Sequence, residues 1–290
     1  MSVPKTMSIV LSLVFTACLL AAGCISRPTA PGESGKLIVA VTILPQKTFV
    51  EAVCGDLAEV ITLVPPGYSP ENYEPAPQEM VKFSQAAVYL TIGVPAETAG
   101  VLSKLKNMTV VDLAAKVAAA YPDREFSPGQ RDPHIWLSPK RVKVMVEAIA
   151  ATMAGLDPPN AAFYQANAAA FRKELDLVDG KIRAALAGMQ DPAFIVLHPA
   201  YGYFADDYGL TMQALEEEGK EATPQHLQDM IDLARAKKIK VVFSQAESDS
   251  KLPDAFAEDI GGKKVLLDPL SDDYLANLVQ MAEAIGGAGS

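Results

Sequence analysis

Residues 159–189, PNAAFYQANAAAFRKELDLVDGKIRAALAGM, decide which folds the rest of the sequence can adopt. The stretch is rich in Ala, Leu, Lys, Arg and Glu and has a proline at its first turn, which together predict one helix. At about 1.5 Å per residue this helix would be roughly 45 Å long, enough to run the length of two lobes. Gly180 could break it, which is the alternative to a single rigid helix.

Strand-like and helix-like segments alternate on both sides of that helix. Before it, the β-rich runs are LIVAVTIL (37–44), VITLV (60–64), AVYLTIG (87–93) and TVVDL (109–113), with helical spacing at 77–85, 96–105 and 139–156. After it, the runs are FIVLH (194–198), TMQAL (211–215), KVVFSQ (240–245) and KVLLD (264–268), with helical spacing at roughly 224–237, 251–259 and 272–285. Such alternation predicts βαβ units. The predicted fold class is therefore α/β, with two lobes, 37–158 and 190–290, that each contain a mainly parallel sheet flanked by helices and are joined by one long helix.

The N-terminus is typical of an exported protein. Lys5 precedes an uncharged apolar run, residues 9–22, which ends in small residues before Cys24. Because a bilayer span takes about 20 apolar residues, this run predicts a cleaved signal rather than a permanent membrane helix.

The end of that signal, AAGC (21–24), resembles a lipobox, in which the cysteine receives the lipid, although Ala21 stands where leucine is usual. We therefore expect a lipoprotein signal peptide over 1–24, a lipid on Cys24 and a flexible Ser-, Pro- and Gly-rich tether over 25–36. An ordinary secretion signal with a chance cysteine is the alternative. Either way, the mature protein is expected to work outside the cytoplasm, anchored to the membrane in the first case.

Charge and cysteine content exclude several classes of protein. The formal net charge is -10 at pH 7, and loss of residues 1–24 removes only Lys5 and gives -11. Such a chain repels nucleic acid. Of three cysteines, Cys54 alone lies in the expected folded part, so no internal disulfide can form. The apolar stretch before Cys54 indicates a small buried hydrophobe rather than a metal ligand.

Three histidines are the possible imidazole ligands. His134 lies in a proline-bounded turn, DPHIWLSP (132–139), and His198 ends FIVLH at the carboxyl edge of a predicted parallel sheet, where α/β proteins bind ligands. Taken singly, each is more often structural. If the lobes face each other, however, both imidazoles can converge on zinc or a related transition metal. His226, in the first turn of a helical segment, is expected to cap the helix or face solvent.

Two carboxylates are candidates for further metal donors. Asp268 ends KVLLD before a proline, as His198 ends its strand; capping of the next helix is the alternative role. Glu71 lies in the loop VPPGYSPENYEP (64–75) and is free to point at a cleft, whereas Glu74 is better placed to cap the following helix.

Four motifs in this order, PPGYSPENYEPAP, DPHIWLSP, LHPAYGYFADDYGL and LLDPL, resemble those of the zinc/manganese-type metal-binding lipoproteins of ABC importers. The likeness covers nearly the whole mature chain. It implies two α/β lobes joined by a rigid helix, and a metal held by one residue from each motif for delivery to an ABC permease and its ATPase. Carried over residue by residue, the ligands are Glu71, His134, His198 and Asp268. A monomer is the simpler expectation.

The chain also departs from that family. Glu71 stands where the family has a histidine, and the resulting set of two nitrogens and two carboxylates favours manganese or iron, with zinc still open. The stretch before His134, AAYPDREFSPGQRDP (119–133), lacks the histidine-rich loop of many zinc-specific members. In FSQAESDSK (243–251) a glutamate is common where Gln245 stands, and neither Gln245 nor Glu247 is predicted to be a ligand.

Two functions of other classes stay open at this point. A secreted metalloenzyme could also use two histidines and a carboxylate, but it needs an open coordination position, and no general base, nucleophile elbow or phosphate loop accompanies these residues. A surface adhesin of this family would show a partner-binding patch that sequence does not reveal. The expected function is metal capture without catalysis.

Overall fold

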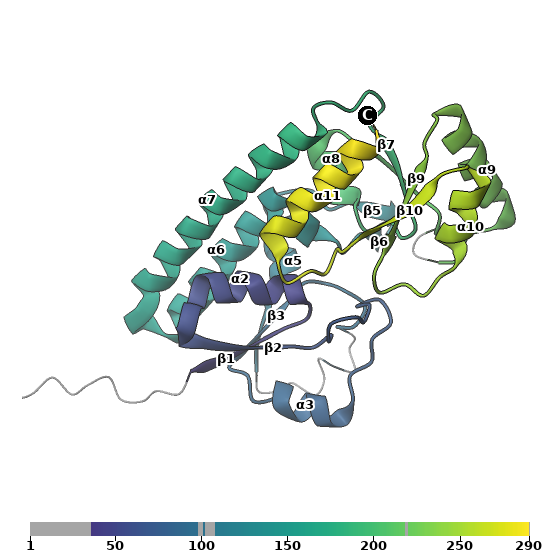
Figure 1. Cartoon of the computed structure of the whole chain (residues 1–290). Coiled ribbons are helices and arrows are strands. Elements are labelled where there is room, and N and C mark those ends of the chain that lie inside the picture. The colour runs from purple at the N-terminus through teal and green to yellow at the C-terminus, as the bar shows by residue number, and fades with distance from the viewer. Residues whose placement is uncertain (1–35, 98–100, 102–107, 218–219, 290) are drawn as a thin grey trace, which may run out of the picture. The chain divides into compact units, whose positions relative to one another are not determined.

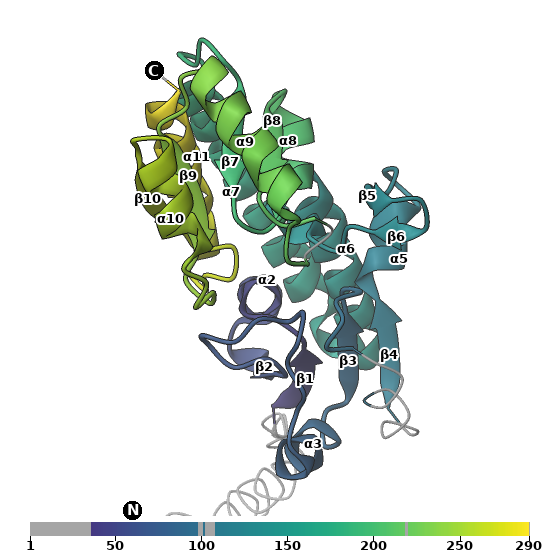
Figure 2. The same cartoon turned by 90° about the vertical axis from the view of Figure 1, so that its right-hand side faces the viewer.

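Two parallel four-stranded sheets form the framework of the computed structural model, which describes residues 36–97, 101, 108–217 and 220–289. The first sheet has the order β2-β1-β3-β4, with β1 (Leu37–Val41), β2 (Ala58–Thr62), β3 (Val88–Thr91) and β4 (Thr109–Asp112). The second has the order β10-β9-β7-β8, with β7 (Ala193–Val196), β8 (Thr211–Ala214), β9 (Val241–Gln245) and β10 (Lys263–Leu267). A short antiparallel pair, β5 (Glu125–Ser127) and β6 (Gln130–Arg131), precedes His134. Figure 2 shows the four strands of the first sheet side by side in this order.

Helices cover the sheets and connect them. The first lobe contains α2 (Leu44–Cys54), α3 (Pro77–Phe83), α5 (Leu113–Ala118) and α6 (Pro139–Leu156), and the second contains α8 (Gly202–Tyr208), α9 (Pro224–Ala236), α10 (Leu252–Asp259) and α11 (Tyr274–Ala288). Between the lobes, α7 (Ala161–Leu186) is one helix of 26 residues that continues through Gly180. In Figure 1, α6 and α11 lie beside α7, and both helices pack against it. The predicted α/β fold, with two lobes joined by one long helix, is confirmed.

One hydrophobic core extends through both lobes. Successive residues of a strand point to opposite faces of the sheet. In β1, Val39 and Val41 therefore join the core that α2, α6 and α7 cover, whereas Ala40 packs in a separate cluster with Met80 and Phe83 of α3. The second sheet repeats this pattern, since its inner side chains join the same shared core and its outer side chains pack under α9 and α10. The two lobes are thus packed together by apolar side chains and not merely tethered.

Buried polar contacts also join the lobes close to the histidines. Trp136 is 1% exposed, and its Nε1 donates a hydrogen bond of 2.7 Å to the carbonyl oxygen of Pro269 in the second lobe. In return, the Tyr274 hydroxyl donates to the carbonyl oxygen of Trp136 at 2.6 Å. These two contacts fix the first-lobe turn that carries His134 against the loop that follows β10. An exposed contact joins α2 to the same loop, since Thr48 donates to the carbonyl oxygen of Asp272 at 2.7 Å.

The start of the first lobe differs from the sequence-based prediction. The run LIVAVTIL was predicted to be strand-like over 37–44, but β1 ends at Val41 and α2 begins at Leu44. The reason is local, because the Gln46 side-chain oxygen accepts hydrogen bonds from the backbone N–H groups of Thr42 and Ile43, at 2.9 and 3.1 Å. The buried Gln46 side chain thus accepts from two backbone N–H groups that a longer strand would have paired, and the chain enters α2 instead.

Several predictions fall outside the described residues. They are the signal peptide over 1–24 with the lipid on Cys24, the tether up to residue 35, and most of the predicted helix at 96–105. Within the described part of the chain, no helix combines the length and the apolar character needed to cross a membrane.

Gly286 tests how closely α11 approaches α7. A Cβ atom at Gly286 would lie 2.4 Å from the carbonyl oxygen of Ala185, whereas one at the neighbouring, exposed Gly287 would meet nothing within 4 Å. We expect Gly286→Ala to lower the free energy of unfolding by about 1–3 kcal/mol through overpacking. Gly287→Ala, the matched control, should raise it by about 0.5–1 kcal/mol, because alanine favours the helix. Urea unfolding followed by circular dichroism measures both, and equal effects of the two substitutions would contradict the close approach.

Candidate metal centre

Side chains from both lobes converge at the carboxyl ends of the strands. Glu71, His134 and His198 each offer one ligand atom, and these three atoms all lie within 4.8 Å of one another. Among the described residues, no other three Asp, Glu, His or Cys side chains come together in this way. Glu71 Oε1 is 3.6 Å from His134 Nε2 and 4.0 Å from His198 Nε2. The two imidazole rings pack edge to face with centroids 5.2 Å apart. The structure therefore brings together three of the four residues that the family resemblance assigns as ligands.

His198 is placed by the register of the second sheet. It lies two residues beyond the end of β7, and the neighbouring parallel strand β8 ends two residues before Glu216. The backbone N–H of Glu216 donates to the carbonyl oxygen of Leu197 at 2.9 Å, which continues the pairing past the strand ends. As a result, Glu216 Oε2 lies 2.8 Å from His198 Nδ1. A carboxylate accepts, so Nδ1 carries the proton and Nε2 keeps its lone pair for a ligand.

His134 has the same arrangement in the first lobe. Asp132 Oδ1 accepts hydrogen bonds from both the backbone N–H and the Nδ1 of His134, at 2.9 and 2.8 Å. Asp132 is fully buried and His134 is 3% exposed. Each imidazole is therefore oriented by its own carboxylate, with Nε2 directed at Glu71. Hydrogen bonds of this kind fix the tautomer and raise the basicity of a metal-binding histidine.

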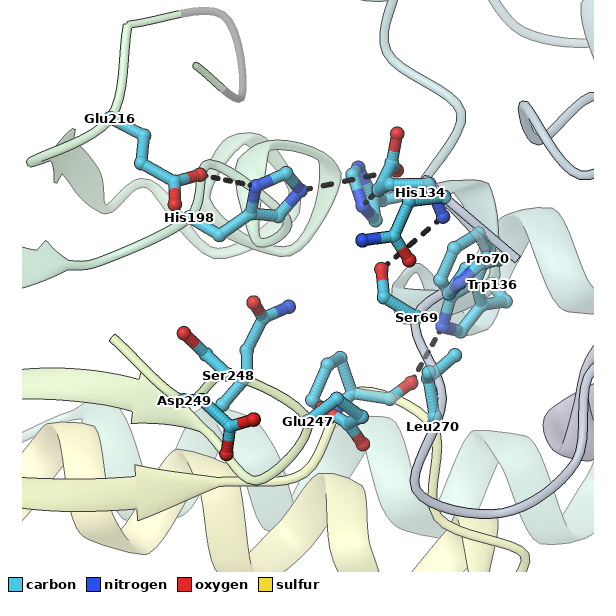
Figure 3. A pocket seen from close by; sticks show the side chains of 14 residues that line it. Ser69, Pro70, His134, Trp136, His198, Glu216, Glu247, Ser248, Asp249 and Leu270 are labelled. Atoms are coloured by element: carbon cyan, nitrogen blue, oxygen red, sulfur yellow. Dashed lines mark hydrogen bonds and ion pairs between the residues drawn. The ribbon is translucent and has the colours of Figure 1, made fainter. Parts of the chain in front are cut away.

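The three side chains line a cavity of about 360 Å³. Its other lining residues are Ser69, Pro70, Asn72, Trp136, Glu216, Gln245, Glu247, Ser248, Asp249, Pro269 and Leu270. Figure 3 shows His198 lying between Glu216 and His134 on one side of this cavity, with Glu247 and Leu270 on the other. Among the described residues, Glu71 Oε1, His198 Nε2 and Glu247 Oε2 are buried atoms without a hydrogen-bond partner. Buried acceptors without a partner are costly, and their lone pairs are what a cation would bind.

Asp268, the fourth residue that the resemblance assigns as a ligand, lies outside this cluster. Its Oδ1 accepts a hydrogen bond of 2.9 Å from the backbone N–H of Leu270, and its side chain lines an adjacent cavity together with Glu247. Glu247 lines both cavities. Burial, and to a smaller extent the nearby Asp268 carboxylate, raises the pKa of Glu247. No lysine or arginine lines either cavity among the described residues, so the carboxylates of Glu247 and Asp268 lie beside the three converging donors without a neighbouring cation.

Asp132 and Glu216 are the site residues that sequence reasoning missed. Asp132 stood two residues before His134 in a quoted motif, and Glu216 followed a predicted strand by one residue. The available signal was the sheet edge, because an acid at the end of a strand beside the one that carries His198 must lie close to it. This signal could be used only once the structure had shown that β8 lies next to β7.

Two other candidates lie away from the cluster, although His226, which was predicted to cap its helix or to face solvent, packs its ring against the end of β8 instead. His226 Nε2 is 2.9 Å from the carbonyl oxygen of Ala214, and its ring is half-buried. Cys54 is fully buried, and burial raises its pKa to about 12, so its thiol stays protonated. Neither side chain contributes to the converging donors.

Comparisons with known proteins identify a family and several similar chains. The family model of ZnuA, the periplasmic component A of a zinc-uptake complex, matches residues 39–288. FimA of Streptococcus parasanguinis, a metal ABC transporter substrate-binding lipoprotein, is 28% identical over 268 residues, which cover 88% of this chain and 86% of FimA. A crystal structure of ZnuA is 38% identical with a TM-score of 0.83 and covers 88% of this chain and all of that one. FpvC of Pseudomonas aeruginosa, solved in complex with Mn²⁺, is 26% identical with a TM-score of 0.76 and covers 88% of this chain and 98% of FpvC.

Removal of the carboxylate that orients His198 tests this arrangement. In Glu216→Gln the side chain keeps its size but loses its charge, so His198 is less firmly held in the tautomer that leaves Nε2 free. We expect affinity for zinc and manganese to fall by about 10–100-fold, the loss typical for such partners. Competition with a chromogenic chelator measures the affinity. Glu221→Gln, at an exposed acid further along the same connection, is the control and should bind as the unmodified protein does; equal affinities in both variants would rule out the orienting role.

Proposed function

Because this chain belongs to the family of periplasmic zinc-uptake components, we propose that it captures a divalent transition metal between its two lobes and delivers it to an ABC import permease. Membership of that family, matched over residues 39–288, makes the chain a solute-binding protein and not an enzyme. The resemblance read from the four sequence motifs is confirmed, and the metalloenzyme alternative loses its support.

The observation that carries the proposal is the convergence of Glu71, His134 and His198. Two donors that bind one zinc ion at about 2.1 Å stand roughly 3.4 Å apart in a tetrahedron. The spacings of 3.6 and 4.0 Å from Glu71 Oε1 to the two Nε2 atoms are close to this value, and the three ligand atoms all lie within 4.8 Å of one another, so a contraction of the cluster would let them bind one ion. The buried and unsatisfied state of Glu71 Oε1 and His198 Nε2 supports the same assignment.

Charge in the cavity favours a cation over any other small solute. Glu71, Glu216, Glu247 and Asp249 all line it, and no lysine or arginine does among the described residues. The fit of a divalent metal is therefore electrostatic as well as geometric.

The donor set bears on which metal is carried. Two imidazoles with one carboxylate, and Asp268 as the fourth ligand that the family resemblance assigns, form a harder set than three histidines with one acid. We propose manganese or zinc as the cargo, with iron as the third possibility. ZnuA names a zinc-uptake component and FpvC was solved with Mn²⁺, so both metals occur among similar proteins.

The cellular arrangement follows from the family and from the N-terminal sequence. We propose that residues 1–24 are a lipoprotein signal peptide, that Cys24 carries the lipid anchor, and that residues 25–36 are the tether. The lobes over 37–158 and 190–290, with the linking helix over 159–189, would then act as an extracytoplasmic monomer beside the permease and its ATPase. The name of FimA as a lipoprotein supports the anchor.

Metal analysis tests the proposed function directly. The mature domain, purified without chelator, should hold about one zinc or manganese ion per chain, and His198→Ala should lose it, because one of the three converging donors is gone. His226→Ala is the matched control, since this histidine contacts a backbone carbonyl away from the cluster. Unmodified protein that holds no metal and titrates with neither ion would end the proposal.

The fourth donor needs a separate pair of variants. We expect Asp268→Asn to weaken metal binding by about tenfold or more, because it removes a carboxylate from the donor set. Glu247→Gln removes the other half-buried carboxylate and is the comparison. Isothermal titration with manganese measures both. A loss confined to Glu247→Gln would reassign the fourth donor from Asp268 to Glu247.

A further inference from the structure

We propose that Arg124 is a positioning residue for metal binding, because it links the carboxylate that orients His134 to the segment of the second lobe that follows His198. This inference rests on the proposed function. It concerns how the distance between the two histidines is set, and not which atoms hold the metal.

The Asp132 carboxylate is shared between two partners. Its Oδ1 accepts both hydrogen bonds from His134, while its Oδ2 lies 3.5 Å from Nε of Arg124 in an ion pair. The Asp132 side chain is completely buried, whereas that of Arg124 is 32% exposed. Arg124 Nε and Asp132 Oδ2 make no hydrogen bond, so their attraction is that of an ion pair. The Arg124 charge stabilises the Asp132 carboxylate in its charged form on the side that the two hydrogen bonds to His134 leave unpaired, and thereby favours the orientation that holds the His134 ring.

Arg124 reaches the second lobe by the same side chain. Its Nη1 donates to both carboxylate oxygens of Asp206 in α8, at 2.9 and 3.0 Å. A second link runs in parallel, because the backbone N–H of Arg124 donates to the Tyr203 hydroxyl at 2.8 Å, and that hydroxyl donates to the carbonyl oxygen of Asp132 at 3.1 Å. Arg124 is thus bonded to α8 at Asp206 and Tyr203, and Asp132 is bonded to Tyr203 and, through its backbone N–H, to the carbonyl oxygen of Arg124.

Gly202 makes this close approach possible. A Cβ atom at this first residue of α8 would lie 2.2 Å from Arg124 Nε and 2.7 Å from Asp132 Oδ2. Any side chain there would push the ion pair away from α8. The ion pair can therefore lie this close to α8 only because residue 202 has no Cβ atom. This observation does not depend on the hydrogen bonds that Arg124 makes.

The position of these contacts along the chain gives them their effect. Gly202 lies four residues after His198, and Asp132 lies two residues before His134. Contacts between the two short segments fix how far apart the two histidines stand, although the histidines come from different lobes. A guanidinium suits this task, because its planar fork can hold two carboxylates at once, which a lysine ammonium on a flexible stem does less well.

The test compares four variants for zinc and manganese affinity and for the rate of metal release into excess chelator. Arg124→Gln should weaken binding by about tenfold and speed release, as expected when a group that orients a metal ligand is lost. Arg124→Lys keeps the charge without the fork and should lie between Gln and the unmodified protein. Asp206→Asn breaks only the interlobe arm and should reproduce most of the Arg124→Gln loss. Arg172→Gln, which removes an arginine paired with Glu147 between α7 and α6, is the control and should bind normally.

Gly202→Ala adds a variant in which Arg124 and Asp132 are both retained but displaced, and it should show the same faster release. Melting temperatures distinguish a positioning role from a folding role. A positioning role predicts that the metal-free variants melt at nearly the same temperature as the metal-free unmodified protein, and that added metal raises their melting temperature by less.

Two results would overturn the inference. One is normal metal affinity in Arg124→Gln. The other is normal affinity in Asp206→Asn beside weak binding in Arg124→Gln, which would mean that Arg124 acts on Asp132 alone and does not couple the lobes. Neither result touches the proposed function, which fails only if the unmodified protein holds no metal and titrates with neither ion.

Discussion

The burial of Trp136 between the lobes is the contact on which the metal centre depends. Its indole packs in the shared core, its Nε1 bonds to the carbonyl oxygen of Pro269 in the second lobe, and its own carbonyl receives the hydroxyl of Tyr274. The ring also packs against that of His134, with centroids 5.1 Å apart. A large aromatic side chain buries much apolar area and still offers one donor, which suits it to a wedge between two domains. The turn that presents His134 is therefore fixed to the second lobe by the residue two positions further along.

The fold class could be predicted from the sequence because it depends on local pattern, whereas pattern offered the two histidines and the acids only as candidates and the family resemblance assigned them as a ligand set. Alternating strands and helices imply parallel sheets, and the carboxyl ends of parallel strands are where His198 and its neighbours had to lie. The helix over 159–189 was predictable from composition, and α7 falls within it as a single helix. The transition at Leu44 was not predictable, because it depends on the Gln46 side chain accepting hydrogen bonds that a strand would have used otherwise.

The parts of the centre that pattern could not supply are those that depend on which strands are neighbours. Glu216 orients His198 only because β8 pairs with β7, and nothing in the order of the two strands along the chain requires this. Asp132 was visible in the motif, but its role follows from its complete burial and from the Oδ1 atom that accepts twice. Asp268 shows that position at a strand end is not sufficient. Its place at a strand end resembles that of His198, yet a backbone N–H two residues on holds its side chain outside the cluster. Position at a sheet edge selects candidates, and side-chain hydrogen bonds decide which way each one points.

The continuous core has a further consequence for how this chain is made. Helix α11 is the last helix of the described chain, and it packs on α7 so closely that Gly286 has no room for a side chain. During synthesis, α2 and α6 are available to pack on α7 as soon as it is made, but the face of α7 that contacts α11 has to wait for the last helix. That apolar face stays uncovered until residues near 288 are available, and an exposed face of this kind is prone to aggregation. Holding this part of the core unfolded until α11 has been made would limit that exposure.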